Sequence, residues 1–133
     1  HARERGIDWR PPIMSAATVS GFDIIVDFDS LLPLVIDRTF CKVRPDAGFT
    51  IAEGAIAVTD VRQTGQRQIT VTAAADPIGT SIEYCWRRQD GGDVLDQWPI
   101  CTGAIRDAWT APSYFDPAGR PLVRAALAYQ LPL

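Results

Sequence analysis

The sequence predicts an all-β fold, an antiparallel β-sandwich of about seven or eight strands, and three observations lead to it. Of the 13 basic residues only Lys42 is a lysine, and of the 16 acidic residues only Glu4, Glu53 and Glu83 are glutamates. Lysine and glutamate cover exposed helix faces, whereas aspartate favours turns and caps. The ten glycines and ten prolines add turn chemistry. Apolar residues alternate with period two in short runs that turn signals separate.

Length and charge narrow the function classes. A chain of 133 residues, 47% hydrophobic and 22% charged, fits one globular domain with a core of its own. A net charge of -3 and a pI of about 5.0 argue against a nucleic-acid partner. No apolar run approaches the roughly 18 residues that a membrane helix needs, so we expect no membrane insertion.

The first residues differ from the rest. Residues 2–10 are typical of the end of a helix, with Gly6 as its stop signal and Pro11-Pro12 preventing continuation. We therefore expect residues 1–12 to be a helix end and linker from a preceding domain and residues 13–133 to be the β-sandwich. A start at His1 rather than Met indicates a piece of a longer polypeptide, with the chemistry of the parent upstream.

Period two begins after Ser15. One face of the first strand is expected to be buried (Phe22, Ile24, Val26, Phe28), and Pro33 places the next strand at an edge or strand end. The strands expected in the first half cover residues 22–29, 32–37, 49–51, 56–61 and 69–73, the last with Thr70 and Thr72 facing outward.

The second half alternates less regularly. Turns are expected at 76–79, 90–93 and 116–119, where aspartate or proline stands beside glycine. Strands are expected at 81–86, with Trp86 in the core, at 104–109, and from Leu122 in one run to the end of the chain.

The residues argue against catalysis within this chain. A serine or cysteine triad needs a histidine base, and the only histidine is His1. Three cysteines make an odd count, so either Cys85 and Cys101 pair across a hairpin or the thiols are buried and free. No cysteine or histidine spacing indicates zinc. We expect no cofactor.

Two groups of carboxylates have more than one interpretation. Asp23, Asp27 and Asp29 should share the outer face of one strand, with Asp37 near them. In one interpretation they act as the acid and base of a glycosidase or bind Ca²⁺. In the other they form a solvated strand face that discourages edge pairing. The loop aspartates are either Ca²⁺ candidates or turn residues that cap the backbone; they are Asp90, Asp93 and Asp96.

Aromatic residues gather in the C-terminal half. We expect Trp98 and Trp109 either at the edge of the core or on a ligand-binding surface. On such a surface, these tryptophans, together with Tyr114 and Phe115, would stack on sugar rings or anchor a protein interface. Arg106 either locks the loop onto a carboxylate or main-chain carbonyls or binds a ligand.

Several of these residues carry a resemblance to a family. The segment 103–107 (Gly-Ala-Ile-Arg-Asp) with Ser113, the ending 126–131, and the earlier stretches 33–37 and 48–51 resemble the C-terminal β-domain of SGNH-hydrolase proteins of the sialate O-acetylesterase-like kind. These occur in alphaproteobacteria, their phages and gene transfer agents. Residues 1–12, with Trp9, are similar to the helix end that closes the hydrolase domain.

The resemblance implies a function for the whole chain. The family's nucleophilic serine and Asp-x-x-His motif lie in the preceding domain and are absent here. We expect a non-catalytic accessory β-sandwich of a phage-like surface protein, a spike, fibre or tail. We expect this domain to bind cell-surface polysaccharide of the host or to dock to neighbouring virion subunits. The alternatives are a stabilising domain of a carbohydrate O-acetylesterase and a purely structural virion subunit. A homo-oligomer on the virion or outside the cell, cytoplasmic during assembly, is the corresponding expectation.

Overall fold

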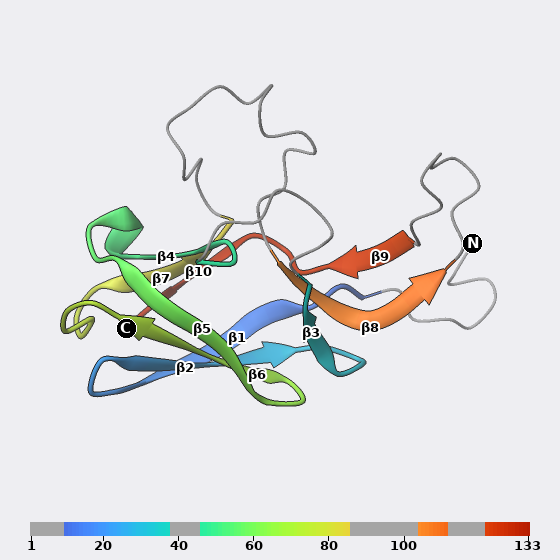
Figure 1. The fold of residues 1–133 in the computed structure, drawn as a ribbon, viewed down its shortest axis with the longest axis horizontal. Helices are drawn as coiled ribbons and strands as arrows, with labels where there is room; N and C mark the ends of the chain where they lie inside the picture. The colour runs from blue at the N-terminus through green and yellow to red at the C-terminus, as the bar shows by residue number, and fades with distance from the viewer. Residues whose placement is uncertain (1–9, 38–45, 86–103, 112–121) are drawn as a thin grey trace, which may run out of the picture.

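Strands and turns make up the part of the chain that the structure, a computed structural model, describes: residues 10–37, 46–85, 104–111 and 122–133 (Figure 1). Within these ranges there are ten strands and one short 3₁₀ helix, and every ladder is antiparallel. The all-β, antiparallel prediction is therefore confirmed. The predicted helix end at 2–10 lies outside the described residues.

The largest sheet has four strands in the order β1-β2-β6-β5. They are β1 (Ile13–Ser20), β2 (Asp23–Asp29), β5 (Val58–Gly65) and β6 (Gln68–Ala73). Ile24 and Val26 of β2 lie opposite Val71 and Ile69 of β6, and all four side chains are buried. The predicted period-two alternation therefore holds for Ile24, Val26 and Phe28, which lie on the core face because successive strand residues point to opposite faces.

Two smaller sheets complete the fold. One has the order β10-β7-β4, from β4 (Phe49–Ile51), β7 (Ser81–Tyr84) and β10 (Tyr129–Pro132). The other has the order β3-β8-β9, from β3 (Leu34–Ile36), β8 (Ile105–Ala111) and β9 (Leu122–Ala125). The helix η1 (Ala52–Gly54) follows β4. Because the ladders form three sheets, the two-sheet arrangement of a sandwich stays a prediction.

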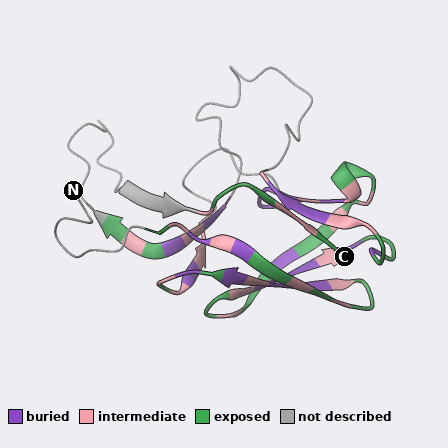
Figure 2. Cartoon of the chain, turned by 180° about the vertical axis from the view of Figure 1, so that it is seen from behind, coloured by how far each residue is buried: buried purple, intermediate pink, exposed green. Residues whose placement is uncertain are grey.

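The core lies where the sheets face one another, and buried residues alternate with exposed ones along the strands (Figure 2). Phe49 and Tyr84 are its largest fully buried rings, with centroids 5.0 Å apart and planes tilted by 59°, a favourable aromatic arrangement. The Tyr84 hydroxyl accepts a hydrogen bond of 3.0 Å from the backbone N–H of Ile105. This contact joins β7 to β8 and satisfies the one polar atom of a buried side chain.

The two ends of the described chain depart from the sequence prediction. The sequence did not separate β1 from β2, although a turn at Gly21, with φ 63°, makes them a hairpin. The predicted last strand is wrong as one run, since β9 and β10 belong to different sheets. Between them Ala126 N–H donates to the Ile105 carbonyl and Leu127 N–H to the Pro12 carbonyl. The chain changes partners there, which side-chain alternation does not record.

Two single residues also differ. Phe22 was predicted on the buried face and is 53% exposed, because it lies in the β1–β2 turn before the ladder begins. Thr70 points outward as predicted but is only 4% exposed, and its hydroxyl lies 3.0 Å from that of Thr64. Among the residues described, no helix has the length and apolar character needed to cross a membrane.

Candidate functional site

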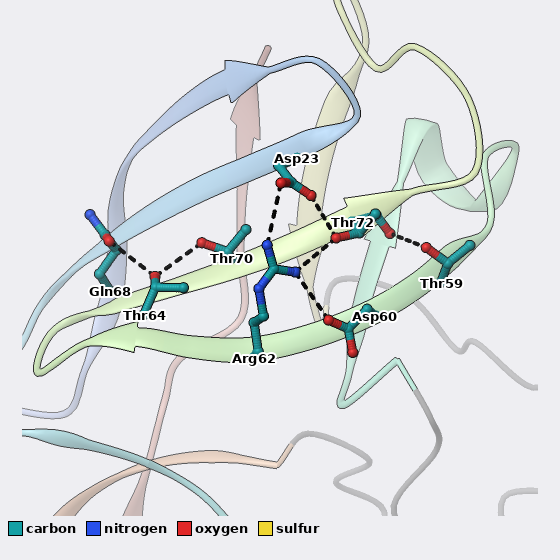
Figure 3. A network of polar contacts seen from close by, with 8 residues as sticks. All are labelled: Asp23, Thr59, Asp60, Arg62, Thr64, Gln68, Thr70 and Thr72. Atoms are coloured by element: carbon teal, nitrogen blue, oxygen red, sulfur yellow. Dashed lines mark hydrogen bonds and ion pairs between the residues drawn. The ribbon is translucent and has the colours of Figure 1, made fainter.

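The outer face of the four-stranded sheet carries polar side chains in register across its strands (Figure 3). The ladders align one residue of each strand into cross-strand rows, because opposite residues on neighbouring strands share a face. Two such rows are Ser20–Asp23–Thr72–Asp60 and Thr18–Ile25–Thr70–Arg62. Apart from Ile25, the residues of these two rows carry carboxylates, hydroxyls and one guanidinium.

Arg62 is the centre of this network. Its Nη1 donates to Asp60 Oδ2 at 3.0 Å and to Thr72 Oγ1 at 3.0 Å, and its Nη2 donates to Asp23 Oδ2 at 3.3 Å. Thr72 passes its own proton on to Asp23 Oδ1 at 2.6 Å. Four side chains from three strands therefore hold one another in place while remaining open to solvent.

The hydrogen bonds and ion pairs of this network also shift the pKa values of Asp23 and Arg62. The hydrogen bond from the Thr72 hydroxyl lowers the pKa of Asp23 most strongly. Burial acts in the opposite direction, and the Arg62 guanidinium lowers the pKa further, so the pKa of Asp23 lies below its usual value. Asp60, followed by Asp23, raises the pKa of Arg62. Hydrogen bonds and opposite charges favour the ionised forms of Asp23 and Arg62.

Further polar contacts extend the network along the sheet. Thr64 Oγ1 donates to Gln68 Oε1 at 3.0 Å, and Gln68 Nε2 donates to Asp27 Oδ1 at 3.2 Å. Thr59 Oγ1 donates to the Thr72 carbonyl at 3.2 Å. Carboxylates accept, a guanidinium donates and hydroxyls do both. Such a mixture matches ligands that carry many hydroxyl groups.

A second polar cluster is buried. Glu83 of β7 is fully buried and lies in register between Thr50 of β4 and Gln130 of β10. Its Oε1 accepts from Thr50 Oγ1 and from the Glu53 backbone N–H, both at 2.8 Å. Its Oε2 accepts from Ser81 Oγ and, at 3.4 Å, from Gln130 Nε2. Both carboxylate oxygens are therefore satisfied, as burial of a charged group requires.

The turn beside Glu83 has an unusual backbone. Ala52 and Glu53 have φ values of 51° and 55°, in the left-handed region that side chains with a Cβ disfavour. This conformation aims the Glu53 N–H at the Glu83 carboxylate. The hydrogen bond that the Glu53 N–H donates to the buried Glu83 carboxylate supplies a reason for the strained turn to persist.

Arg106 lies in a third polar contact. Its Nε donates to Asp37 Oδ2 at 2.8 Å, with side chains only 19% and 15% exposed, and its Nη1 donates to the Asp107 carbonyl at 2.8 Å. Asp107 is buried, and its Oδ1 accepts from the Trp109 backbone N–H at 2.9 Å. Arg106 therefore contacts a carboxylate and a main-chain carbonyl, the two kinds of partner expected if it locks the loop in place. A ligand role for Arg106 stays a prediction.

The structure places the other predicted site residues as follows. Trp109 is half-buried on β8. Asp29 Oδ2 lies 3.7 Å from Arg10 Nη1. Asp37 follows β3 and forms an ion pair with Arg106 on the neighbouring strand β8, in a different sheet from the aspartates of β2. The remaining site candidates, and Trp86, which was predicted in the core, lie outside the described residues. These candidates are Trp98, Tyr114, Phe115, Asp90, Asp93, Asp96 and Cys101. The disulfide between Cys85 and Cys101 therefore stays a prediction.

No group of three or more histidine, cysteine, aspartate or glutamate residues that could hold a metal ion occurs within the described ranges. The sequence interpretation had missed both Arg62 and Glu83. A glutamate within an apolar alternating strand was the available signal for Glu83. Arg62 gave no such signal, because two of its three partners, Asp23 and Thr72, come from β2 and β6.

Comparison with known proteins adds no relative. A scan against protein-family models, a search of curated proteins and a search of solved structures each found no match.

Proposed function

We propose that this chain is a non-catalytic β-domain that binds a glycan on the outer face of the sheet β1-β2-β6-β5. The observation that carries the proposal is the Asp23–Arg62–Asp60 network with Thr72, in which donors and acceptors are fixed by one another before any ligand arrives. Preorganised side chains lose little conformational entropy on binding. Sugar hydroxyls both donate and accept, so a face of alternating charge suits them better than a single-sign patch.

The setting of this domain follows from the sequence resemblance and is part of the proposal. The domain belongs to a phage-like surface protein, and its ligand is a cell-surface polysaccharide of the host. The aromatic version of the same function uses Trp109 with Trp98 and Tyr114. The two versions differ in which side chains touch the sugar, and mutagenesis separates them.

Binding of bacterial capsular and lipopolysaccharide glycans on an array, followed by calorimetry on the strongest hit, tests the proposal. Arg62→Ala should weaken binding about tenfold or more, since it removes hydrogen bonds to a charged group. Arg67→Ala is the matched control, because that arginine bonds to the Ser30 and Leu31 carbonyls away from the network. The affinity of Arg67→Ala for the glycan should stay within about twofold of that of the wild type.

Two results would contradict the proposal. Absence of binding to every glycan tested refutes the function. Unchanged affinity in Arg62→Ala together with loss of binding in Trp109→Ala refutes the polar face and favours the aromatic surface.

A second candidate, docking to a neighbouring domain or virion subunit, is supported by exposed apolar residues near the β1–β2 turn. Phe22 and Ile78 are 53% and 63% exposed, and the Phe22 carbonyl accepts from Ala73 N–H just before the loop that holds Ile78. Phe22→Ser with Ile78→Ser should abolish co-purification with the full-length parent's hydrolase-like domain. Retained co-purification would exclude this surface as the docking site.

A further inference from the structure

Arg62 keeps part of its guanidinium available to a ligand. Its Nη1 donates to Asp60 and to Thr72, and its Nη2 donates to Asp23 (Figure 3). Among the residues that the structure describes, no contact uses the Nε–H or the second N–H of Nη2. Nε and Nη2 lie on the same edge of the planar guanidinium and form a fork of two donors. Because the side chain is 45% exposed, this fork can reach a ligand.

The two carboxylates beside this guanidinium can still accept hydrogen bonds. Asp60 Oδ2 accepts from Arg62, whereas Asp60 Oδ1 accepts no hydrogen bond within the described part of the chain. Each oxygen of Asp23 accepts one hydrogen bond, from Thr72 or from Arg62. An ionised carboxylate oxygen has a second lone pair, so Asp23 can accept further protons. A ligand on this face thus meets two adjacent donors flanked by acceptors.

The charge of this face favours a ligand without a negative charge. The carboxylates of Asp23, Asp27 and Asp60 oppose the single guanidinium of Arg62, which leaves a formal net charge of -2. The last aspartate of β2 forms an ion pair with Arg10. A ligand carboxylate would match the shape of the Arg62 fork. It would, however, lie beside two carboxylates that the same guanidinium already holds, and like charges repel.

We propose that the ligand of this face is an uncharged glycan, held by a pair of neighbouring sugar hydroxyls. The Arg62 fork donates to the two hydroxyl oxygens, as it would to the two oxygens of a carboxylate. The same hydroxyls donate their protons to Asp23 and Asp60. A pair of hydroxyls satisfies the donors and the acceptors together, which a carboxylate cannot do because it only accepts. This inference rests on the proposed function and adds the class of sugar to it.

The charge of the glycans that bind tests the class. On an array with neutral glycans and glycans that carry uronic acid, sialic acid or phosphate groups, the neutral ones should bind. Oxidation of the primary hydroxyls of the strongest neutral ligand to carboxylates adds charge and leaves the ring hydroxyls in place. The oxidised glycan should bind about tenfold more weakly at low salt, and the difference should shrink at high salt, which screens the repulsion.

Asp60→Asn should change the two affinities in opposite directions. It should weaken binding of the neutral glycan about threefold, because an amide oxygen is a weaker acceptor than a carboxylate. It should strengthen binding of the oxidised glycan by about the same factor, because one repelling charge is gone. Glu53→Gln changes the net charge equally but lies on η1, outside this sheet. Both affinities of Glu53→Gln should stay within about twofold of those of the wild type.

Periodate tests the hydroxyl pair, because it cleaves the bond between two carbons that carry neighbouring hydroxyls. The neutral glycan should lose its binding after this treatment and reduction of the aldehydes formed. Binding that survives periodate, or an oxidised glycan that binds as tightly as its neutral parent, overturns this inference but leaves glycan binding intact. Absence of binding to every glycan refutes the proposed function as well.

Discussion

Carboxylates and threonine hydroxyls meet in two clusters of this molecule, one buried on β7 and one on the outer face of β5 and β6. Glu83 is fully buried and receives hydrogen bonds from Thr50, Ser81, Gln130 and a backbone N–H. Asp23 takes similar contacts from Thr72 and Arg62 but stays open to water. The chemistry of the two clusters is alike, and their environment differs.

Burial decides what each cluster does. When a buried carboxylate is removed, the polar groups that donated hydrogen bonds to it are left without a partner or water, and this is costly. An exposed network whose member is removed is rehydrated, so its contribution to stability is small. The Glu83 cluster is therefore structural, and the Arg62 cluster remains open to a ligand. The following changes test that division in order of expected effect.

Glu83→Ala should have the largest effect. It removes the acceptor of four donors inside the protein, and we expect a loss of about 3 kcal/mol or more in the free energy of unfolding. Urea denaturation followed by fluorescence measures it. Asp60→Ala, which removes an exposed carboxylate, is the control and should leave the midpoint nearly unchanged. Equal effects of the two changes would contradict the division by burial.

Arg106→Ala should have an intermediate effect, because its ion pair with Asp37 is mostly but not fully buried. We expect a loss of about 2 kcal/mol, since Asp37 and the Asp107 carbonyl each lose a donor. The same denaturation experiment compares it with Arg67→Ala. If Arg106→Ala loses less free energy of unfolding than Arg67→Ala, Arg106 does not lock the loop in place.

Ala52→Gly should stabilise the protein slightly. Glycine adopts the φ of 51° found at this position without the Cβ penalty, so we expect a gain of up to about 1 kcal/mol after its entropic cost. Ala55, with φ -72° and ψ -26°, is the matched control. Ala55→Gly should lose stability because nothing there is relieved. A loss in both variants would show that the turn is not strained.

The acid dependence of the exposed cluster should be the smallest effect. The pKa of Asp23 is lowered, first by the Thr72 hydroxyl and then by Arg62. Its contribution is therefore present above the usual aspartate pKa and is lost as the pH falls through the lower, folded value. Melting temperatures between about pH 2 and 7 should show wild type and Asp23→Asn converging below about pH 4. A difference that grows on acidification would reverse the sign and refute this assignment.

The sequence predicted the parts of the fold that depend on local alternation. Ile24, Val26 and Phe28 are buried as expected, and the β5–β6 hairpin turns near Gly65. Phe22 was misplaced because a turn interrupts the alternation before it. The β1 strand was not separated because its small residues show little contrast between faces.

The candidate sites could be predicted less well. An outer strand face with Asp23 and Asp27 was visible in the sequence, but Arg62 reaches it only because β6 pairs with β2 on one side and β5 on the other. A glutamate in an apolar alternating strand marked Glu83 as unusual, but the pattern did not show its burial, because solvent-facing residues alternate in the same way. Its burial depends on η1 folding back toward β7.

The sequence by itself determined that this chain forms short antiparallel strands with apolar inner faces, because side-chain alternation and turn residues act over a few positions of the backbone. Only the tertiary structure decided which carboxylates are buried and which are paired. Those properties depend on residues far apart in the chain, such as Asp37 with Arg106 and Asp23 with Arg62, whose energies exist only once the sheets have assembled.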